Sequence, residues 1–149
     1  MIELRPVTNA DVAPVADLAG RLYAELSNGT SAGKDRTAAV AEILARTDRC
    51  FGFLATADGV PIGLAMATEG VAIFAGGAYG QITELYVAPA FRSRGVASLL
   101  VRRVAGLGRE RGWRRIDVGA PPQPAWRRSV QFYLREGFVE VGPRLKLNV

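Results

Sequence analysis

The sequence contains no histidine and only one cysteine among its 149 residues. Without histidine, the chain can build neither a histidine-based zinc site nor a Ser-His or Cys-His catalytic pair, and no metal site is predicted. A single cysteine, Cys50, also rules out an intramolecular disulfide. Because Cys50 lies in an apolar run, we expect a buried thiol rather than a nucleophile.

Long apolar runs are missing as well. The longest uncharged stretch, residues 70–83, is shorter than the ~20 residues of a bilayer span and is interrupted by glycines. Charges at Glu3, Arg5 and Asp11 are not typical of a secretory signal. We therefore expect a soluble, cytoplasmic protein without a membrane partner.

The hydrophobic pattern predicts an α+β fold in one domain that covers residues 1–149, a length that can bury a core without disulfides or metal. Thr8 and Asp11 form a capping signature at the start of the first helix. Segment 71–80 fits either a hairpin through Gly76 and Gly77 or a flap, and we favour the hairpin. Strands are expected at residues 2–5, 50–57, 60–68, 81–87, 113–119, 138–141 and 145–149, and helices at 8–26, 34–46, 93–111 and 126–136.

The stretch QITELYVAPAFRSRGVASLL, residues 81–100, combines a strand, a turn with arginines and glycine, and a helix. The first turn of a helix leaves backbone N–H groups without partners and carries a partial positive charge. Gly95 would let a phosphate approach the main chain, and Arg92 and Arg94 would add forked donors. This order favours a diphosphate site, although an ordinary strand-loop-helix connection fits the same residues.

Two motifs in this chain resemble those of one family. RSRGVA, residues 92–97, fits the Q/R-x-x-G-x-G/A pattern of the GCN5-related N-acetyltransferases (GNAT), and FYLREGF, residues 132–138, is similar to their closing segment. The resemblance covers most of the C-terminal half. It implies a mixed, mostly antiparallel central sheet of about seven strands flanked by about four helices, with acetyl-CoA as co-substrate.

The resemblance also implies where acetyl-CoA would bind. Main-chain groups of Leu85, Tyr86 and Val87 would pair with the pantetheine arm like an added strand. Ser129 could offer a hydroxyl to the same arm, while Trp126 and Arg127 replace the asparagine that the family often has there. The diphosphate would lie on the turn and first helical residues, namely Arg92, Ser93, Arg94, Gly95, Val96, Ala97 and Ser98.

Two residues are candidates for catalysis. The resemblance assigns Tyr133 as the general acid that protonates the leaving thiolate, although Tyr133 could simply pack beside Phe132. Glu84 is the candidate base or amine anchor, and alternation along the strand turns it away from Leu85; a surface glutamate paired with an arginine is the competing interpretation. Tyr23, Glu25 and Asp35 are candidates to line the acceptor site, against a plain surface role for each.

Charge is unevenly distributed along the chain. Residues 1–74 hold six basic and nine acidic side chains, and residues 75–149 hold thirteen and five, so the two parts carry net charges of −3 and +8. Attraction to polyanions therefore belongs to the second part, where coenzyme A would satisfy it. We predict no nucleic-acid partner, because the arginines between residues 102 and 115 are interpreted mainly as a solvated helix face with only Trp113 and Trp126 near them.

The leading functional hypothesis is an N-acetyltransferase that moves the acetyl group of acetyl-CoA to a primary amine of a small molecule or protein, by direct attack in a ternary complex. The acidic first part mildly favours a cationic acceptor. The alternative is a non-catalytic module that senses acetyl-CoA. Many relatives form homodimers, but no feature of this sequence decides the oligomeric state.

Overall fold

The computed structural model describes residues 1–122 and 125–149. It divides into two compact units, Met1–Val118 and Gly119–Val149, and each is described by itself. Gln123 and Pro124, which fall between the predicted strand 113–119 and the predicted helix 126–136, lie outside the described residues. The prediction of one domain over the whole chain stays a prediction.

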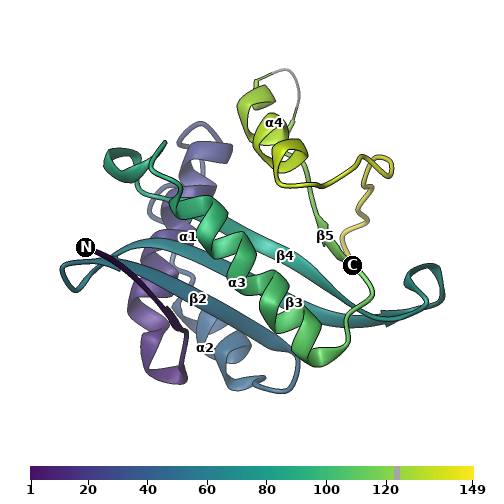
Figure 1. Ribbon diagram of the computed structural model, residues 1–149. Helices are drawn as coiled ribbons and strands as arrows, with labels where there is room; N and C mark the ends of the chain where they lie inside the picture. The colour runs from purple at the N-terminus through teal and green to yellow at the C-terminus, as the bar shows by residue number, and fades with distance from the viewer. Residues whose placement is uncertain (123–124) are drawn as a thin grey trace. The chain divides into compact units, whose positions relative to one another are not determined.

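The first unit is built on a sheet with strand order β1-β2-β3-β4-β5 (Figure 1). The first four strands pair antiparallel, and β5 runs parallel to β4. This confirms the α+β class and the mixed, mostly antiparallel sheet. The strands are β1 (Ile2–Pro6), β2 (Cys50–Ala57), β3 (Val60–Ala72), β4 (Gly77–Val87) and β5 (Ile116–Val118).

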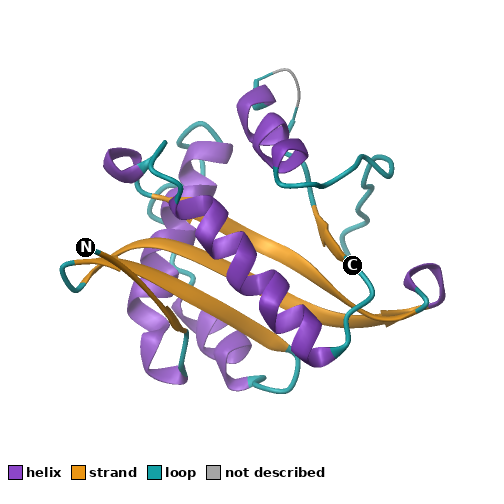
Figure 2. Cartoon of the chain, viewed as in Figure 1, coloured by secondary structure: helices purple, strands orange, loops and turns teal. Residues whose placement is uncertain are grey.

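Helices cover both faces of this sheet (Figures 1 and 2). One face carries α1 (Val12–Leu26) and α2 (Thr37–Ala45), and the other carries α3 (Val96–Arg111). The core lies between these layers, where Leu18 of α1, Leu54 and Leu64 of the sheet, and Leu100 of α3 are fully buried. Over residues 1–122 and 125–149, no helix is long and apolar enough to cross a membrane.

Turn chemistry explains the two hairpins. Asp58 and Gly59 both adopt positive φ, 49° and 82°, which is the conformation that a two-residue hairpin turn needs. The short 3-10 helix η2 (Ile73–Ala75) and Gly76, whose φ is 78°, turn the chain from β3 into β4. The predicted hairpin at residues 71–80 is therefore confirmed in place of the flap.

The chain enters α1 through a capped 3-10 helix, η1 (Asn9–Asp11). The predicted capping box is present: Asp11 accepts the N–H of Thr8 at 2.7 Å, and the Thr8 hydroxyl accepts the N–H of Ala10. Arg5 donates two further hydrogen bonds to the Asp11 carboxylate at 2.8 and 2.9 Å. Asp11 is only 7% exposed, so these donors lower the pKa of its carboxyl to about 2.

The second unit contains α4 (Arg127–Arg135). The strands predicted at residues 138–141 and 145–149 are wrong, because no strand is present between Phe138 and Val149. The described residues therefore hold five strands and not about seven, while the prediction of about four helices is right. Leu145 and Leu147 are almost fully exposed, at 96% and 86%, so this segment has the alternating pattern of a strand without a neighbour to pair with.

Candidate functional site

The strand β4 is paired unequally on its two sides. Its residues from Gly77 to Val87 pair with β3, but β5 meets it only at Gly80, Gln81 and Ile82. At Thr83 the register with β3 shifts, because Ile82 pairs with Ala67 and Glu84 pairs with Met66. Beyond this bulge, one edge of β4 has no strand beside it in the described residues.

Hydrogen bonding shows which peptide groups point to that open edge. Ala88 donates its N–H to the carbonyl of Ile62 at 2.8 Å, so the Ala88 peptide faces β3. Peptide groups alternate along a strand, which turns Tyr86 toward β3 and Leu85 and Val87 toward the open edge. Of the three main-chain partners predicted for the pantetheine arm, Leu85 and Val87 face the open edge and Tyr86 faces β3. The Val87 carbonyl already accepts from Arg92 Nε at 2.8 Å, which leaves the Val87 N–H for an added strand.

The open edge leads directly to the start of α3. The chain passes through the 3-10 helix η3 (Pro89–Phe91) and a turn in which Ser93 and Gly95 adopt positive φ, 63° and 79°. Gly95 is the N-cap of α3 and has no side chain to cap the helix. Val96 is buried in the core, so it offers only its backbone N–H at this helix end. The first turn of α3 thus has the chemistry of an anion site.

The two arginines of this turn differ in their surroundings. Arg92 donates from Nε to the carbonyl of Val87 at 2.8 Å and pairs with both carboxylate oxygens of Glu25 at 2.8 and 3.0 Å. This clamp joins the end of α1 to the end of β4, with the Arg92 guanidinium 5.4 Å above the Tyr86 ring. Arg94 lies 5.5 Å from the Phe91 ring and makes no ion pair in the part of the chain that the structure describes. Its donors are the ones that remain available to an anion.

Burial and hydrogen bonding to Glu25 raise the pKa of the Tyr86 hydroxyl, which therefore stays protonated beside the clamp. The sequence predicted Glu25 as an acceptor-site residue and Arg92 as a phosphate ligand. Their mutual ion pair was not predicted, because they are 67 positions apart.

Glu84 lies on the face of the sheet that α1 covers. The hydroxyl of Tyr23 on α1 donates to Glu84 Oε2, and the hydroxyl of Thr83 donates to Oε1 at 2.6 Å. Both carboxylate oxygens therefore have a hydroxyl donor. The predicted competitor, a Glu84–arginine pair, is not formed among the described residues.

Tyr23 contacts both Glu84 and Arg36, the residue that precedes α2. Burial and the hydrogen bond to Glu84 raise the pKa of the Tyr23 hydroxyl, so it keeps its proton and acts as a donor. Its ring also carries the guanidinium of Arg36, 4.9 Å from the centroid. Asp35, the third predicted acceptor residue, accepts the N–H of Thr37 at 2.9 Å at the start of α2 and is exposed.

The second unit holds the remaining predicted residues. Tyr133 packs edge-on between Phe132 and Phe138, with ring centroids 5.4 and 5.5 Å away. Burial raises the pKa of its hydroxyl to about 12, so the phenol carries a proton at neutral pH. Trp126 is the N-cap residue of α4, and Ser129 donates its N–H to the Trp126 carbonyl at 3.0 Å. Arg127, the first residue of α4, is exposed.

No group of three or more His, Cys, Asp or Glu residues that could hold a metal ion is found in residues 1–122 and 125–149. Strand β4 and the start of α3 present hydrogen-bond donors, the Glu84 carboxylate and a helix N-terminus.

The sequence profile described as the Acetyltransferase (GNAT) family matches residues 21–138, which is most of the chain. The family resemblance inferred from RSRGVA and FYLREGF is thereby confirmed. No curated protein sequence matches the chain closely enough to count as a relative.

Solved structures share the fold over nearly the whole chain. An aminoglycoside acetyltransferase from an uncultured soil metagenomic sample is 24% identical, with a TM-score of 0.82 and coverage of 100% of this chain and 99% of its own. A ribosomal-protein-alanine N-acetyltransferase from Brucella melitensis biovar Abortus 2308 is 18% identical, with a TM-score of 0.78 and coverage of 100% and 99%. A predicted acetyltransferase with acetyl-CoA from Clostridium acetobutylicum is 20% identical, with a TM-score of 0.79 and coverage of 99% and 96%.

Proposed function

Since this chain belongs to the acetyltransferase (GNAT) family, we propose that it transfers the acetyl group of acetyl-CoA to a primary amine by direct attack in a ternary complex. The observation that carries this proposal is the open edge of β4 at Leu85 and Val87, which leads directly into the uncapped N-terminus of α3. A solved neighbour with the same fold contains acetyl-CoA. Acetyl-CoA would supply an acetyl thioester, which is already activated toward an amine.

The chain offers a separate binding element for each part of this co-substrate. The peptide groups of Leu85 and the N–H of Val87 match the amides of the pantetheine arm in the manner of an added strand. The backbone N–H groups from Val96 onward, together with Arg94, suit the diphosphate. Gly95 leaves the approach to these groups open, because no heavy atom lies within 4 Å of the position its Cβ would take.

The acceptor amine would be handled by Glu84. Amines are protonated at neutral pH, and a proton must leave before the nitrogen lone pair can attack. Tyr23 and Thr83 orient the Glu84 carboxylate from both sides, so that it can hold the ammonium and accept its proton, directly or through water. The net reaction forms the C–N bond, breaks the C–S bond and leaves a thiolate that needs a proton.

Tyr133 is the proposed source of that proton. Its phenol carries a proton at neutral pH because burial raises its pKa to about 12, so a proton is available for the leaving thiolate. Tyr133 belongs to the second unit, so its assignment rests on the family motif and on this retained proton. Ser129 on the same helix remains the proposed hydroxyl for the pantetheine arm.

The acceptor is a small-molecule or protein amine, and solved neighbours include enzymes named for each kind of substrate. The test is an amine panel that holds an aminoglycoside, a polyamine and a peptide with a free N-terminal alanine. Free thiol release is followed with acetyl-CoA, and the acetylated product is identified by mass. We expect one class to give a turnover that Glu84→Gln lowers by at least about tenfold without weakening acetyl-CoA binding. If acetyl-CoA binds but no amine is acetylated, the chain is a sensor module and the proposal fails.

A further inference from the structure

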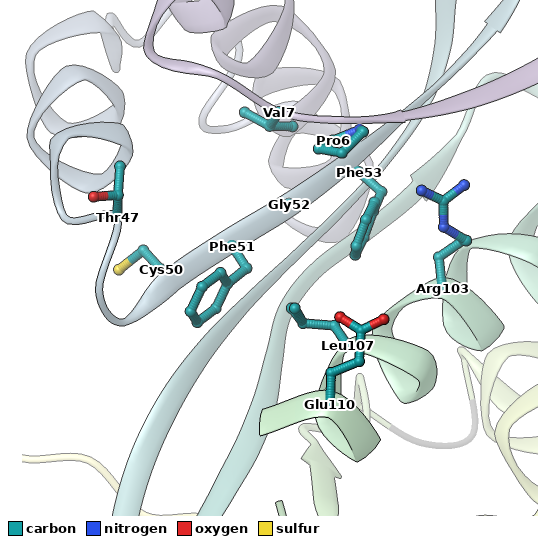
Figure 3. Close-up of a pocket in the computed structure, with 10 residues that line it drawn as sticks. All are labelled: Pro6, Val7, Thr47, Cys50, Phe51, Gly52, Phe53, Arg103, Leu107 and Glu110. Atoms are coloured by element: carbon teal, nitrogen blue, oxygen red, sulfur yellow. The ribbon is translucent and has the colours of Figure 1, made fainter. Parts of the chain in front are cut away.

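A recess lies far along α3 from the proposed acetyl-CoA elements, with a cavity volume of about 380 Å³ (Figure 3). Its floor is apolar and is formed by Phe51 and Phe53 of β2, which point toward α3. One wall is a single stripe of α3, because Arg103, Leu107 and Glu110 are spaced at i, i+4 and i+7. The opposite wall comes from the end of β1. The volume falls in the range of small-molecule pockets.

The α3 wall carries one unpaired charge of each sign. The Arg103 guanidinium lies 4.9 Å from the Phe53 ring centroid and makes no ion pair or hydrogen bond with the described residues. The Glu110 carboxylate likewise has no donor there, whereas the neighbouring Arg111 is bound to Glu69 at 2.6 Å. Seven residues of helix place the two backbone positions about 10 Å apart along the axis. A ligand that satisfies both must carry a positive and a negative end at a similar separation.

The third side of the recess is the short part of the β2 edge that β1 leaves uncovered. Pairing between β1 and β2 ends at Pro6 and Phe53, and Val7 then donates its N–H to the Gly52 carbonyl at 2.8 Å. Cys50 and Phe51 continue beyond β1. Because peptide groups alternate, the Cys50 carbonyl and the Gly52 N–H point to this outer edge. The Cys50 N–H is bonded to the Arg46 carbonyl at 2.8 Å, so this edge offers a peptide one acceptor and one donor.

We propose that this recess binds a short apolar peptide with free termini, extended along α3 over the rings of Phe51 and Phe53. The peptide carboxylate meets Arg103, the peptide ammonium meets Glu110, and apolar side chains cover Phe51 and Phe53. An extended tripeptide spans about 10 Å, which matches the spacing of the two charged residues. A simple anion or a nucleic acid would leave the apolar floor uncovered and would be repelled by Glu110.

The only cysteine of the chain supplies a built-in reporter. Cys50 lines the recess, and burial raises the pKa of its thiol, so alkylation in the free protein is slow but measurable. The full chain, without acetyl-CoA, is treated with iodoacetamide, and Cys50 modification is followed by mass spectrometry. Saturating alanyl-leucyl-alanine should slow the modification by about tenfold. The N-acetylated and C-amidated forms of the same tripeptide each lack one charge and should need about five times more peptide for half protection.

Variants of the wall test the geometry. Arg103→Gln and Glu110→Gln should each raise the half-protecting concentration by about fivefold. Arg102→Gln is the matched control, because Arg102 is exposed on α3 but does not line the recess. All three side chains are exposed, so the variants should unfold at the wild-type temperature. Calorimetric titration of the tripeptide gives a second measure of affinity that does not depend on Cys50.

The proposal is overturned if the tripeptide neither protects Cys50 nor releases heat at millimolar concentration, or if both wall variants bind it like wild type. Binding as an acceptor amine at β4 is a different outcome, because it leaves Cys50 reactive and is lost in Glu84→Gln. The recess and the proposed acetyl transfer therefore succeed or fail separately.

Discussion

Replacing Tyr23 with Phe removes a single hydroxyl and tests whether Glu84 is held for catalysis. That hydroxyl donates to Glu84 Oε2, while Thr83 donates to Oε1 at 2.6 Å. The phenyl ring keeps its packing and its contact with the Arg36 guanidinium, 4.9 Å away. The substitution therefore leaves the fold in place and gives the carboxylate more rotational freedom.

The size of the effect follows from this geometry. A hydrogen bond to a charged group contributes about 1.5 to 3 kcal/mol. Water and the remaining Thr83 bond offset part of the loss, so we expect about 1.5 kcal/mol in the transition state. This corresponds to roughly a tenfold drop in kcat/KM for the amine, with the Kd for acetyl-CoA unchanged.

The assay is thiol release at saturating acetyl-CoA, with the amine varied. Thr83→Val should act in the same direction, and the double variant should lose more than the two single losses combined, because both hydroxyls serve one carboxylate. Tyr79→Phe is the control, since Tyr79 lies on the β3–β4 hairpin against Phe74 at 5.3 Å. If Tyr23→Phe stays within twofold of wild type while Glu84→Gln is inactive, then Tyr23 does not position the base.

Four further substitutions test other parts of the molecule. Tyr133→Phe should lower kcat by at least about tenfold with little change in acetyl-CoA binding, and normal turnover would remove Tyr133 from the mechanism. Gly95→Ala and Gly112→Ala both add a Cβ at positive φ, 79° and 74°, with open space around it, so each should cost about 1 kcal/mol of unfolding free energy. Only Gly95→Ala should also weaken acetyl-CoA binding in calorimetry; equal affinity in both variants argues against the anion site. Asp11→Asn should cost about 1 to 2 kcal/mol at pH 7, a range reduced because Arg5 is half exposed. The folded-state pKa of Asp11 is depressed, so this contribution is complete above about pH 5 and fades as the pH falls toward 2. Urea unfolding at pH 7 and pH 3 should show the gap between wild type and variant closing, and a constant gap contradicts the assignment.

Local signals in the sequence predicted most of the fold. The bounds of β2, residues 50–57, were predicted correctly because a turn pair, Asp58 and Gly59, follows a run of strand formers. The end of α3 followed from Gly112 in the same way. Segment 145–149 has equally clear alternation but forms no strand. Alternation describes the two faces of a strand and carries no information about whether a neighbouring edge exists.

In the candidate site, too, features with a local sequence signal were predicted and contacts between distant residues were not. Alternation alone separated Glu84 from Leu85, and the structure places the Glu84 side chain on the α1 face. The Tyr23 donor could not be predicted, because Tyr23 and Glu84 are 61 positions apart and meet only through packing. The bulge at Thr83 also had no signal, since no glycine or proline marks it. The clamp between Arg92 and Glu25 could not be predicted either, because these residues are also far apart in the sequence. It engages one of the two arginines of RSRGVA.

Under the proposed acetyl transfer, β4 would serve both substrates, because its side chains and its peptide groups point in different directions. Side chains of β4 project from the sheet faces, so Glu84 reaches the α1 side, where Tyr23 holds it. Peptide groups project in the plane of the sheet, so Leu85 and Val87 reach the open edge that β5 leaves uncovered after Ile82. Neighbouring residues of a strand are about 3.3 Å apart. An amine held by Glu84 and a thioester bound along Leu85 would therefore meet near the bulge at Thr83.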